Sequence, residues 1–443
     1  MNNKPQIIIR MGSHAEKGYI LKLSNRAFDG IIIGANVVEA TAGATASLVG
    51  KKLNLPYYID PMTYVFGCNL SGIRSEQRQT VNGRKKTVVD YKRSYKALAG
   101  ELGTFFTNVL DSGIPVAPNN FPFSSIQTIC EQVVHYQLNR IRAEFEKDEE
   151  YKDYADSIPS PASIFAPYFY VPFDFGGSLD LFLRLSETTA RTKPGVPVHA
   201  VLCADCNLLN NASFISDVVE KTPKTGIDGV WLWFSMFDEW EAQEGSLRNF
   251  KELVRQLSES GLEVYNRHGG CFSLILHELG MSGISHGIGY GERKDVLQIT
   301  GPPNAPIVNY YLPDVYKRFG VDVIERSFDS LGVTTPKDFH ESICDCAICK
   351  GVIKNDLSDF GRFGDTHYAT PKSKRSSQTP AAAKRCRFHF LMNRIAEKDF
   401  VSRNNIASIV EKLRQAQNKW QPSNLFISFD HVGRWINALV PES

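Results

Sequence analysis

Three cysteines stand close together near the end of the chain, in the stretch "CDCAICK". Thiolates as near to one another as Cys344, Cys346 and Cys349 repel unless a cation neutralises them. Zinc suits such a group, because it accepts sulfur ligands and takes four ligands in a tetrahedron. The C-x-C-x-x-C spacing supplies three corners and therefore predicts a structural zinc site that needs one more ligand.

Candidates for the fourth ligand are His340, His367, Cys386 and His389. His389 is favoured because it begins the helical pattern "HFLMNRIAEKDFV", in which packing would hold the imidazole in place. His367 and Cys386 lie in or beside a segment expected to be flexible, and His340 precedes the cysteines so closely that the chain would be strained. A site closed by four protein ligands would join two segments and would do no chemistry.

Acidic residues and a histidine at the ends of predicted strands form a second group: Asp60, Asp174, Asp205, Asp238, His286, Glu292 and Asp314. Carboxylates gathered there could stabilise an oxocarbenium-like sugar, attack it and carry the proton of a leaving base. Each residue alone could instead cap a helix, and for Asp205, Asp238 and Asp314 that alternative is favoured. His286 lies in the glycine-rich "SHGIGYGE", where a ligand could approach closely, although a core histidine explains the pattern equally well.

The elements that must position these groups alternate between strand and helix from residue 5 to residue 312. The strand candidates are 29–35, 56–60, 163–175, 196–204, 228–234, 262–267, 282–290 and 306–312. Between them lie amphipathic helices such as 246–260, with Gly261 as its C-cap. This rhythm predicts an α/β fold, a (β/α)₈ TIM-like barrel, followed by a C-terminal zinc-binding subdomain.

Two parts follow from this pattern. Residues 1–330 are expected to form the barrel, with a helical insertion near 126–156, and residues 331–443 to form a zinc-binding and helical C-terminal module. A basic segment, 370–387, is predicted to be a flexible loop. Together with the Lys- and Arg-rich stretch 72–96 it could contact a phosphate backbone, although such runs often form only a solvated surface.

Composition excludes several classes of protein. The chain has 443 residues, 42% of them hydrophobic, so it can bury a large core and is not a disordered protein. Nine cysteines at irregular spacing argue against a secreted disulfide framework. The net charge of +2 predicts no strong attraction of the whole molecule to nucleic acid. No membrane segment is found, and we expect a cytoplasmic protein.

The cysteine motif, a later helical histidine and the preceding barrel resemble the tRNA-guanine transglycosylase superfamily, which includes a branch that inserts 7-deazaguanine bases into DNA. Its members exchange a guanine base through a covalent aspartyl–sugar intermediate. Here the segment 350–388, between the third cysteine and His389, is longer than is usual in the family, and the excess corresponds to the basic loop. The resemblance implies a structural Zn²⁺ held by Cys344, Cys346, Cys349 and His389.

The barrel carries further parts of the resemblance. "YYIDPMTY" is similar to the family's aspartate followed by S-G-G-[FY]-Q, which makes Asp60 the general acid/base and Tyr64 the aromatic that stacks on the base. "VPFDFGG" places Asp174 where a carboxylate reads the purine edge. "VHAVLCAD" places Asp205, or Cys206, in contact with the base.

Two departures from the family stand out. Where it has its attacking aspartate, this chain has Ser285 or His286, and no carboxylate until Glu292. In "GIDGVWLWF", Trp233 and Phe234 replace glycines that admit the base. We therefore expect Asp60, His286 and Glu292 as catalytic candidates, with Tyr64, Asp174 and Asp205 binding substrate.

The resemblance implies a pentosyltransferase that exchanges or inserts a purine-type (7-deazaguanine) base in nucleic acid. The expected partners are DNA, preferred over tRNA, and a free purine-like base. A base in a duplex would have to be flipped out. One alternative is a catalytically altered barrel that serves as a nucleic-acid-binding or partner-docking subunit, with a protein partner or a homodimer possible. A third hypothesis is a glycosidic hydrolase that uses Asp60 with Glu292.

Overall fold

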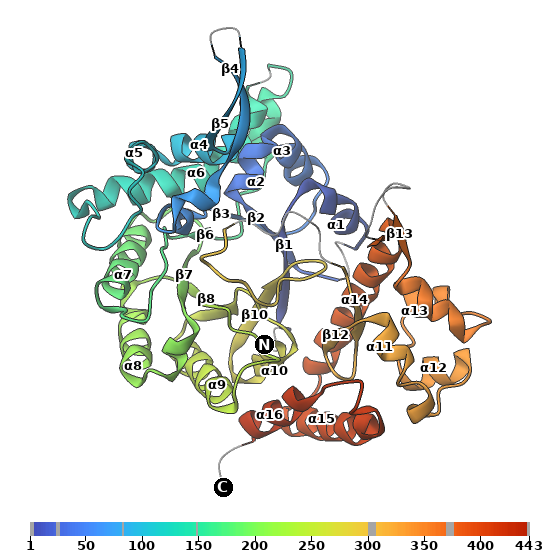
Figure 1. Cartoon of the computed structure of the whole chain (residues 1–443). Coiled ribbons are helices and arrows are strands. Elements are labelled where there is room, and N and C mark those ends of the chain that lie inside the picture. Colours follow the sequence, from blue (N-terminus) through green and yellow to red (C-terminus); the bar gives the residue numbers. More distant parts are fainter. Residues whose placement is uncertain are drawn as a thin grey trace.

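Eight parallel strands form one sheet that curves into a nearly closed barrel (Figure 1). The computed structural model describes residues 4–23, 27–81, 84–147, 149–299, 307–368 and 376–440. In the order of their hydrogen bonding, the strands are β3 (Tyr57–Asp60), β2 (Gly30–Gly34), β1 (Gln6–Met11), β10 (Met281–His286), β9 (Glu263–Asn266), β8 (Gly229–Ser235), β7 (Val198–Asp205) and β6 (Ile164–Phe165). The predicted α/β barrel is confirmed in this outline.

The two ends of the sheet, β3 and β6, approach each other without forming a regular ladder. The backbone N–H of Ala162 donates to the carbonyl of Tyr57 at 2.8 Å. The Thr63 hydroxyl donates to the carbonyl of Tyr168 at 2.8 Å and accepts from its N–H at 2.7 Å. These bonds supply backbone partners where the strand pairing stops, so little of the edge is left unpaired.

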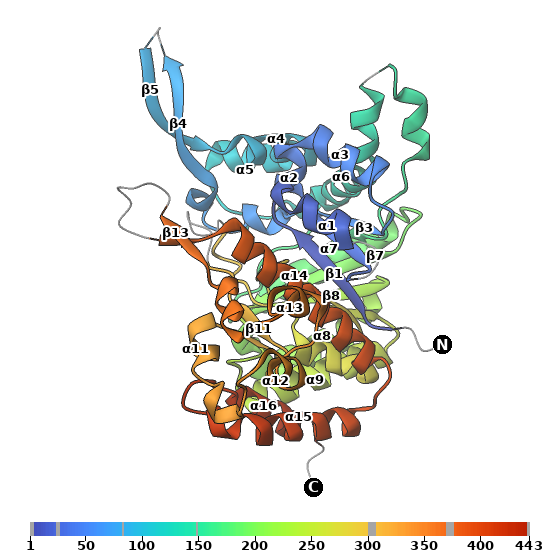
Figure 2. The ribbon, with the colours of Figure 1, turned by 90° about the vertical axis from the view of Figure 1, so that its right-hand side faces the viewer.

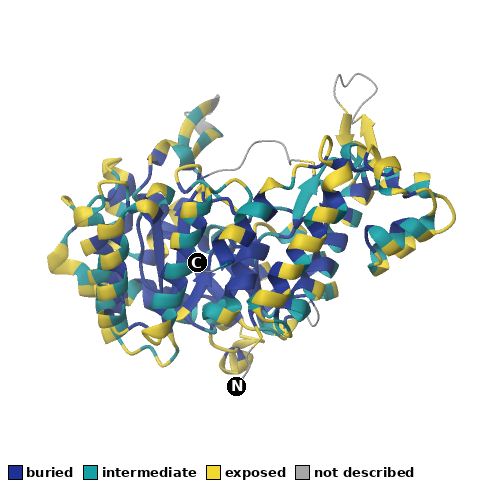
Figure 3. Ribbon diagram, turned by 90° about the horizontal axis from the view of Figure 1, so that it is seen from below, coloured by how far each residue is buried: buried dark blue, intermediate teal, exposed yellow. Residues whose placement is uncertain are grey.

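The inside of the barrel is filled by aromatic side chains. The rings of Trp231 and Tyr265 stack with their centroids 4.4 Å apart. Tyr58 and Phe165 meet the same indole edge-on, at 5.8 and 5.5 Å. The strands are apolar on both faces because one face lines this core and the other meets the helices, and they are coloured as buried in Figure 3.

Helices surround the sheet: α1 (Lys17–Leu23), α2 (Ala35–Ala40), α3 (Ala42–Lys51), α6 (Ile126–Glu146), α7 (Gly176–Arg191), α8 (Ala212–Lys221), α9 (Glu244–Glu259) and α10 (Cys271–Ile275). α9 buries Leu247, Phe250, Leu253, Val254 and Leu257, the apolar positions that its sequence period predicts. Gly261 follows with φ +93°, a conformation that suits glycine at the end of a helix.

The eighth strand differs from the one predicted. Residues 306–312 were expected to complete the barrel, but β11 (Tyr310–Leu312) pairs antiparallel with β12 (Lys317–Phe319) outside the sheet. The barrel is completed by β1, which lies between β2 and β10. Both segments are short and apolar, so periodicity could not distinguish them.

Between β3 and β6 the chain forms more than one crossover helix. A hairpin of β4 (Arg74–Val81) and β5 (Arg84–Tyr91) projects beyond the body of the molecule (Figure 2), and α4 (Arg93–Leu102) and α5 (Thr104–Ser112) follow it. α6, which covers most of the segment predicted as an insertion, packs between α3 and α7 in the ring of helices.

The C-terminal part has its own hydrophobic cluster, which includes Tyr310, Phe339, Phe360 and Trp420. Its elements are β11, β12, α11 (Val321–Glu325), α12 (Pro336–Ser342), α13 (Ala347–Val352), β13 (Thr366–Tyr368), β14 (Ser376–Gln378), α14 (Pro380–Val401), α15 (Ile406–Trp420) and α16 (Asp430–Leu439). α14 contributes Cys386 to this cluster and Phe390 and Leu391 to the barrel core, so it joins the two.

The prediction of a flexible loop at 370–387 is wrong for the second half of that segment. α14 begins at Pro380, where the Thr379 side chain accepts a hydrogen bond from the N–H of Ala382 and caps the helix. Lys384, Arg385 and Arg387 are therefore helical, whereas Lys372, Lys374 and Arg375 lie outside the described residues. In the described part of the chain, no helix combines the length and the apolar character needed to cross a bilayer.

Candidate functional site

The three cysteines and His389 form one compact group. Their ligand atoms all lie within 4.8 Å of one another. Nδ1 of His389 is 3.3 Å from the sulfurs of Cys346 and Cys349, and 3.9 Å from that of Cys344. Four ligands at the bond lengths of a tetrahedral zinc, about 2.0–2.3 Å, are separated by similar distances. The cluster could therefore hold a metal ion.

The surroundings of His389 prepare its ring for this role. Nε2 lies 2.6 Å from the carbonyl oxygen of Tyr311. If Nε2 carries the proton, it donates a hydrogen bond to that carbonyl, and Nδ1 keeps its lone pair for a metal near the sulfurs. This is the usual arrangement around a metal-bound histidine. The Tyr310 ring stacks on the imidazole at 4.0 Å, and its hydroxyl lies 3.1 Å from the sulfur of Cys349.

The other candidate ligands lie elsewhere. Both ring nitrogens of His340 face backbone carbonyls, those of Cys344 and Ile353. The Cys386 thiol faces the carbonyl of Phe363 at 3.4 Å, and His367 is exposed on β13. The favoured set of Cys344, Cys346, Cys349 and His389 is therefore the one that the fold brings together.

A cavity of about 660 Å³ opens at the carboxyl ends of the barrel strands, and we call it the mouth cavity. Its charged lining consists of Arg10, Glu16, Asp60, Lys92, Arg267, Lys294 and Arg387. Its aromatic lining consists of Tyr64, Tyr95, Trp233 and Tyr290. A pocket in this position of a (β/α)₈ barrel is the usual place for a ligand.

Asp60 and Tyr64, two of the predicted site residues, both line the mouth cavity. The Asp60 carboxylate pairs with Arg267 and accepts hydrogen bonds from the Tyr168 hydroxyl at 2.8 Å and the Met62 N–H at 2.9 Å. The Tyr64 ring lies between those of Tyr168 and Trp233, and Nζ of Lys294 donates to its hydroxyl at 3.1 Å. Both side chains are held firmly, with Asp60 6% and Tyr64 1% exposed.

Trp233 and Phe234, adjacent residues of β8, point in opposite directions. Trp233 lines the mouth cavity and stacks obliquely with His268 at 4.9 Å. Phe234 packs on Phe250 of α9, outside the barrel. Trp233 therefore narrows the mouth, but the cavity stays open beside it.

Positive charge dominates the deep part of the cavity. Burial and the nearby Arg10 lower the pKa of the Lys294 ammonium to about 8. Burial and the nearby Arg267 lower the pKa of Arg10 to about 9. Burial and the surrounding cations also lower the pKa of His268, so its ring is neutral.

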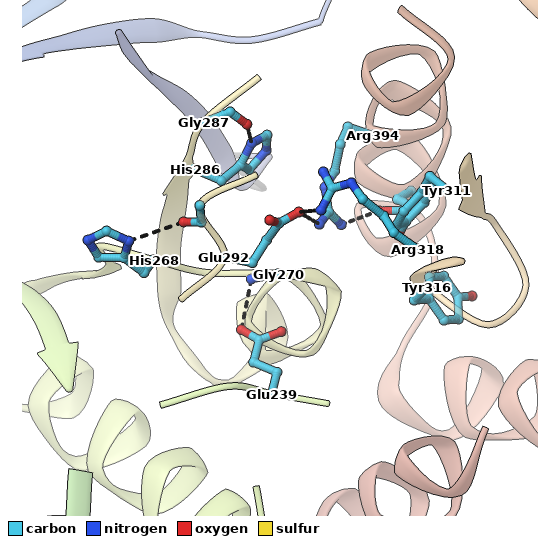
Figure 4. A network of polar contacts seen from close by, with 12 residues as sticks. Glu239, His268, Gly270, His286, Gly287, Glu292, Tyr311, Tyr316, Arg318 and Arg394 are labelled. Carbon is cyan, nitrogen blue, oxygen red and sulfur yellow. Dashed lines mark hydrogen bonds and ion pairs between the residues drawn. The ribbon is translucent and has the colours of Figure 1, made fainter. Parts of the chain in front are cut away.

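His286 and Glu292 do not line the mouth cavity. They lie in a buried group with Arg318 and Arg394 between the barrel and α14 (Figure 4). Glu397 of α14 pairs with Arg394, and we call these five residues the interface network. Arg318 donates to Glu292 at 2.7 Å, and Arg394 approaches the same oxygen at 3.6 Å and pairs with Glu397. Tyr311 donates to Glu397 at 2.6 Å.

Charge in the interface network fixes the protonation of its members. Burial alone would raise the pKa of Glu292, but the charges of Arg318 and Arg394 outweigh it and lower the pKa, so the carboxylate stays charged. Burial and Arg394 lower the pKa of His286 to about 3, so the imidazole is neutral. Its ring packs edge-on against Phe390 of α14. His286 and Glu292, two of the predicted catalytic residues, therefore lie apart from the cavity that Asp60 lines.

Asp174 and Asp205 also lie outside the mouth cavity. Asp174 is exposed just before α7. Asp205 accepts from the Tyr170 hydroxyl at 2.9 Å and from the N–H of Asn207 at 2.8 Å, where it caps a short helical turn. The helix-cap alternative considered for Asp205 matches this geometry.

Three basic residues of the cavity were missed by sequence reasoning: Arg10, Arg267 and Lys294. Arg10 lies near the end of the apolar strand β1, and Arg267 directly follows β9. The rule that placed Asp60 at a strand end would have found these two, had it been applied to basic as well as acidic side chains. Lys294 lies in a loop and carries no such signal.

The chain matches no protein-family model and no curated protein. Among solved structures it is similar to the CBM22-1–GH10 modules of the N-terminal endo-1,4-β-D-xylanase 10B of Clostridium thermocellum, complexed with xylohexaose. The TM-score is 0.30 and the identity 9%. The match covers 64% of this chain and 59% of that chain, less than two thirds of its length.

Proposed function

We propose that the mouth cavity binds a phosphate-bearing segment of nucleic acid. The observation that carries the proposal is the charge of the lining. Five side chains are cationic and two acidic, with Arg10, Lys92, Arg267, Lys294 and Arg387 facing Glu16 and Asp60. Phosphate groups are the anions that such a cavity would attract from nucleic acid, and lysine and arginine contacts to them dominate affinity.

Two further features favour nucleic acid as the source of the phosphate. Aromatic rings line the same cavity, and bases stack on such rings whatever their sequence. Lys92 follows directly after the projecting β4–β5 hairpin, and Arg387 lies on α14, so cations reach the cavity from two sides. We call Lys92 and Arg387 the cavity rim. DNA is preferred over tRNA in this proposal because Pro61, Met62 and Thr63 replace the family's small residues.

We assign zinc to the cysteine–histidine cluster. Three thiolates and one imidazole form a ligand set that zinc prefers, and with four protein ligands no position remains for a substrate. Its role in this proposal is structural: it joins the α12–α13 region to α14. Metal analysis of the purified protein, with one zinc per chain expected, tests the assignment.

A kinship with the tRNA-guanine transglycosylases remains part of the proposal. Besides the ligand set, the backbone after Asp60 supports it: Met62 takes φ +51°, a conformation that favours glycine, at a position where the family motif has glycine. The exchange of a base in nucleic acid for a purine or 7-deazaguanine base is a second candidate function. One observation favours it, the Asp60 carboxylate beside Tyr64 in the cavity.

Binding to nucleic acid is tested by measuring the affinity for single-stranded DNA and for tRNA at several salt concentrations. The variant Lys92→Gln/Arg387→Gln removes the cavity rim. Its matched control, Lys224→Gln/Lys337→Gln, removes two cations that are 68% and 80% exposed and lie away from the cavity. The rim variant should bind more weakly and lower the salt slope by about one per lost phosphate contact. Equal affinity of the two variants would contradict the proposal.

Base exchange is tested by release and uptake of labelled guanine or 7-deazaguanine with DNA and with tRNA. Asp60→Asn should abolish exchange and leave DNA affinity in place, whereas Asp174→Asn, outside the cavity, should leave both unchanged. A wild-type protein that binds DNA but exchanges no base would overturn this second candidate and leave the binding proposal standing.

A further inference from the structure

Arg10, Asp60, Arg267 and Lys294 lie together in the mouth cavity, and we call these four residues its floor. The floor holds more positive than negative charge. Arg267 lies over the aromatic barrel core, 5.5 Å from the Phe165 ring and 5.7 Å from that of Trp231. Its guanidinium pairs with Asp60, which leaves the charges of Arg10 and Lys294 without a carboxylate in the floor.

The interface network does not supply the missing negative charge. Glu292 lies close enough to Arg10 to influence it, but Arg318 and Arg394 already surround that carboxylate, and Glu397 pairs with Arg394. Two glutamates therefore face two arginines there. Glu16 also lines the cavity, but Arg387 acts on it more strongly than Arg10 does. Within the floor, three cations stand against Asp60, an excess of two positive charges.

Hydrogen-bond donors in the floor are also unused. Nε and Nη1 of Arg267 have no partner, although this side chain is only 4% exposed, and Nε of Arg10 has none either. Arg10 uses one Nη for the carbonyl of Gly291 at 2.5 Å. Unpaired buried donors are costly in a folded protein, and the interface network also holds them, on Arg318 and Arg394. The excess of charge, rather than these donors, therefore sets the floor apart.

We propose that this floor is a subsite for a terminal phosphate monoester, the phosphorylated end of a nucleic-acid strand. This inference rests on the nucleic-acid binding proposed above and specifies which part of the strand enters the cavity. A phosphate monoester carries close to two negative charges at neutral pH, which match the excess of two, whereas an internal phosphodiester carries one. Its oxygens accept charge-assisted hydrogen bonds from guanidinium and ammonium groups such as those that line the cavity.

The shape of the cavity leads to the same ligand. Below the floor, the stacked rings of Trp231 and Tyr265 fill the barrel, so the cavity ends there. A strand that continues in both directions cannot place an internal phosphate at a closed end, but a strand terminus can. The volume of about 660 Å³ leaves space above the floor for the terminal nucleotide beside Tyr64 and Trp233.

The first experiment compares short oligothymidylates with a 5′-phosphate, with a 3′-phosphate and with hydroxyl groups at both ends, bound to the wild-type full chain. A terminal phosphate should raise affinity about tenfold or more, because charge-assisted hydrogen bonds contribute that much, and inorganic phosphate should compete. Equal affinity of all three oligonucleotides would overturn the subsite but not nucleic-acid binding. If inorganic phosphate binds but none of the three oligonucleotides does, the phosphate subsite is kept and the nucleic-acid proposal is overturned.

A variant of the floor gives a second, independent measurement. Lys294→Met keeps the length of the side chain and removes one of the excess charges, and Lys224→Gln is the matched control. The variant should lose most of the preference for the phosphorylated end, and its melting temperature without ligand should rise, since like charges no longer repel. A preserved preference together with an unchanged melting temperature would overturn the proposal. The first experiment uses the wild-type protein, so its result does not depend on whether the variant folds correctly.

Discussion

The mouth cavity and the interface network are both rich in arginine, yet their charges are arranged differently. In the interface network, Glu292 and Glu397 face Arg318 and Arg394, so each charge has an opposite partner. In the cavity floor, Asp60 alone faces three cations. A matched buried set holds two parts of a fold together, whereas an unmatched set at a strand end marks a place for a ligand of the opposite sign.

The largest expected effect concerns α14, which carries His389 of the cysteine–histidine cluster and two members of the interface network. Cys346→Ser should lower the free energy of unfolding by more than about 5 kcal/mol, since structural zinc contributes roughly 10–16 kcal/mol of apparent binding free energy in small zinc domains. Urea unfolding and zinc content measure this.

Its matched control is Cys386→Ser, which alters a buried thiol that is not in the cluster. This variant should keep its zinc. A Cys346→Ser protein with full zinc content and wild-type stability would show that the cluster is not a metal site.

The second prediction tests the matched charges. Glu292→Gln leaves Arg318 and Arg394 without their shared carboxylate, and should destabilise the protein by about 3 kcal/mol. Glu187→Gln breaks an exposed pair with Arg191 and should cost under about 1 kcal/mol. Chemical denaturation compares the two, and a cost for Glu292→Gln as small as that of the control would remove the distinction between the regions.

The third prediction tests the unmatched charges through pH. Lys294 has its pKa lowered to about 8, below the value of an unfolded lysine, so its charge opposes folding fully below pH 8 and ceases to do so as pH rises toward 10.5. Lys294→Met should therefore stabilise the ligand-free protein by about 1 kcal/mol near pH 7. This gain should shrink between pH 8 and 10 in unfolding experiments without phosphate. A gain that does not change with pH would point to packing rather than charge.

The smallest effect is the response to salt. Ions can enter the mouth cavity but not the interface network, so added salt should reduce the stability gain of Lys294→Met and leave the cost of Glu292→Gln unchanged. Repeating both measurements at about 0.1 and 1 M salt, where the screening length falls from about 10 to 3 Å, checks this. The opposite pattern would mean that the network, not the cavity, is open to solvent.

Sequence reasoning worked best where the geometry is local. The spacing of Cys344, Cys346 and Cys349 keeps the three sulfurs close together within a short stretch of chain, and the helical pattern around His389 favoured it among the candidates for a fourth ligand. The strand-end rule predicted Asp60 and the family resemblance predicted Tyr64, and both side chains line the cavity. The strand-end rule could not tell which face of a strand end a side chain occupies, and His286 at the end of β10 packs on α14 instead.

The sequence alone determined the period of strand and helix, and with it the α/β barrel, because the spacing of apolar residues decides which local structure can bury them. It also grouped Cys344, Cys346 and Cys349, since their proximity depends on a short spacing, whereas the tertiary structure brings His389 to the three sulfurs. Only the tertiary structure decided that β1 completes the barrel and that Arg10, Arg267 and Lys294 meet beside Asp60. Those meetings depend on how distant strands align when the sheet closes, and no local pattern records that alignment.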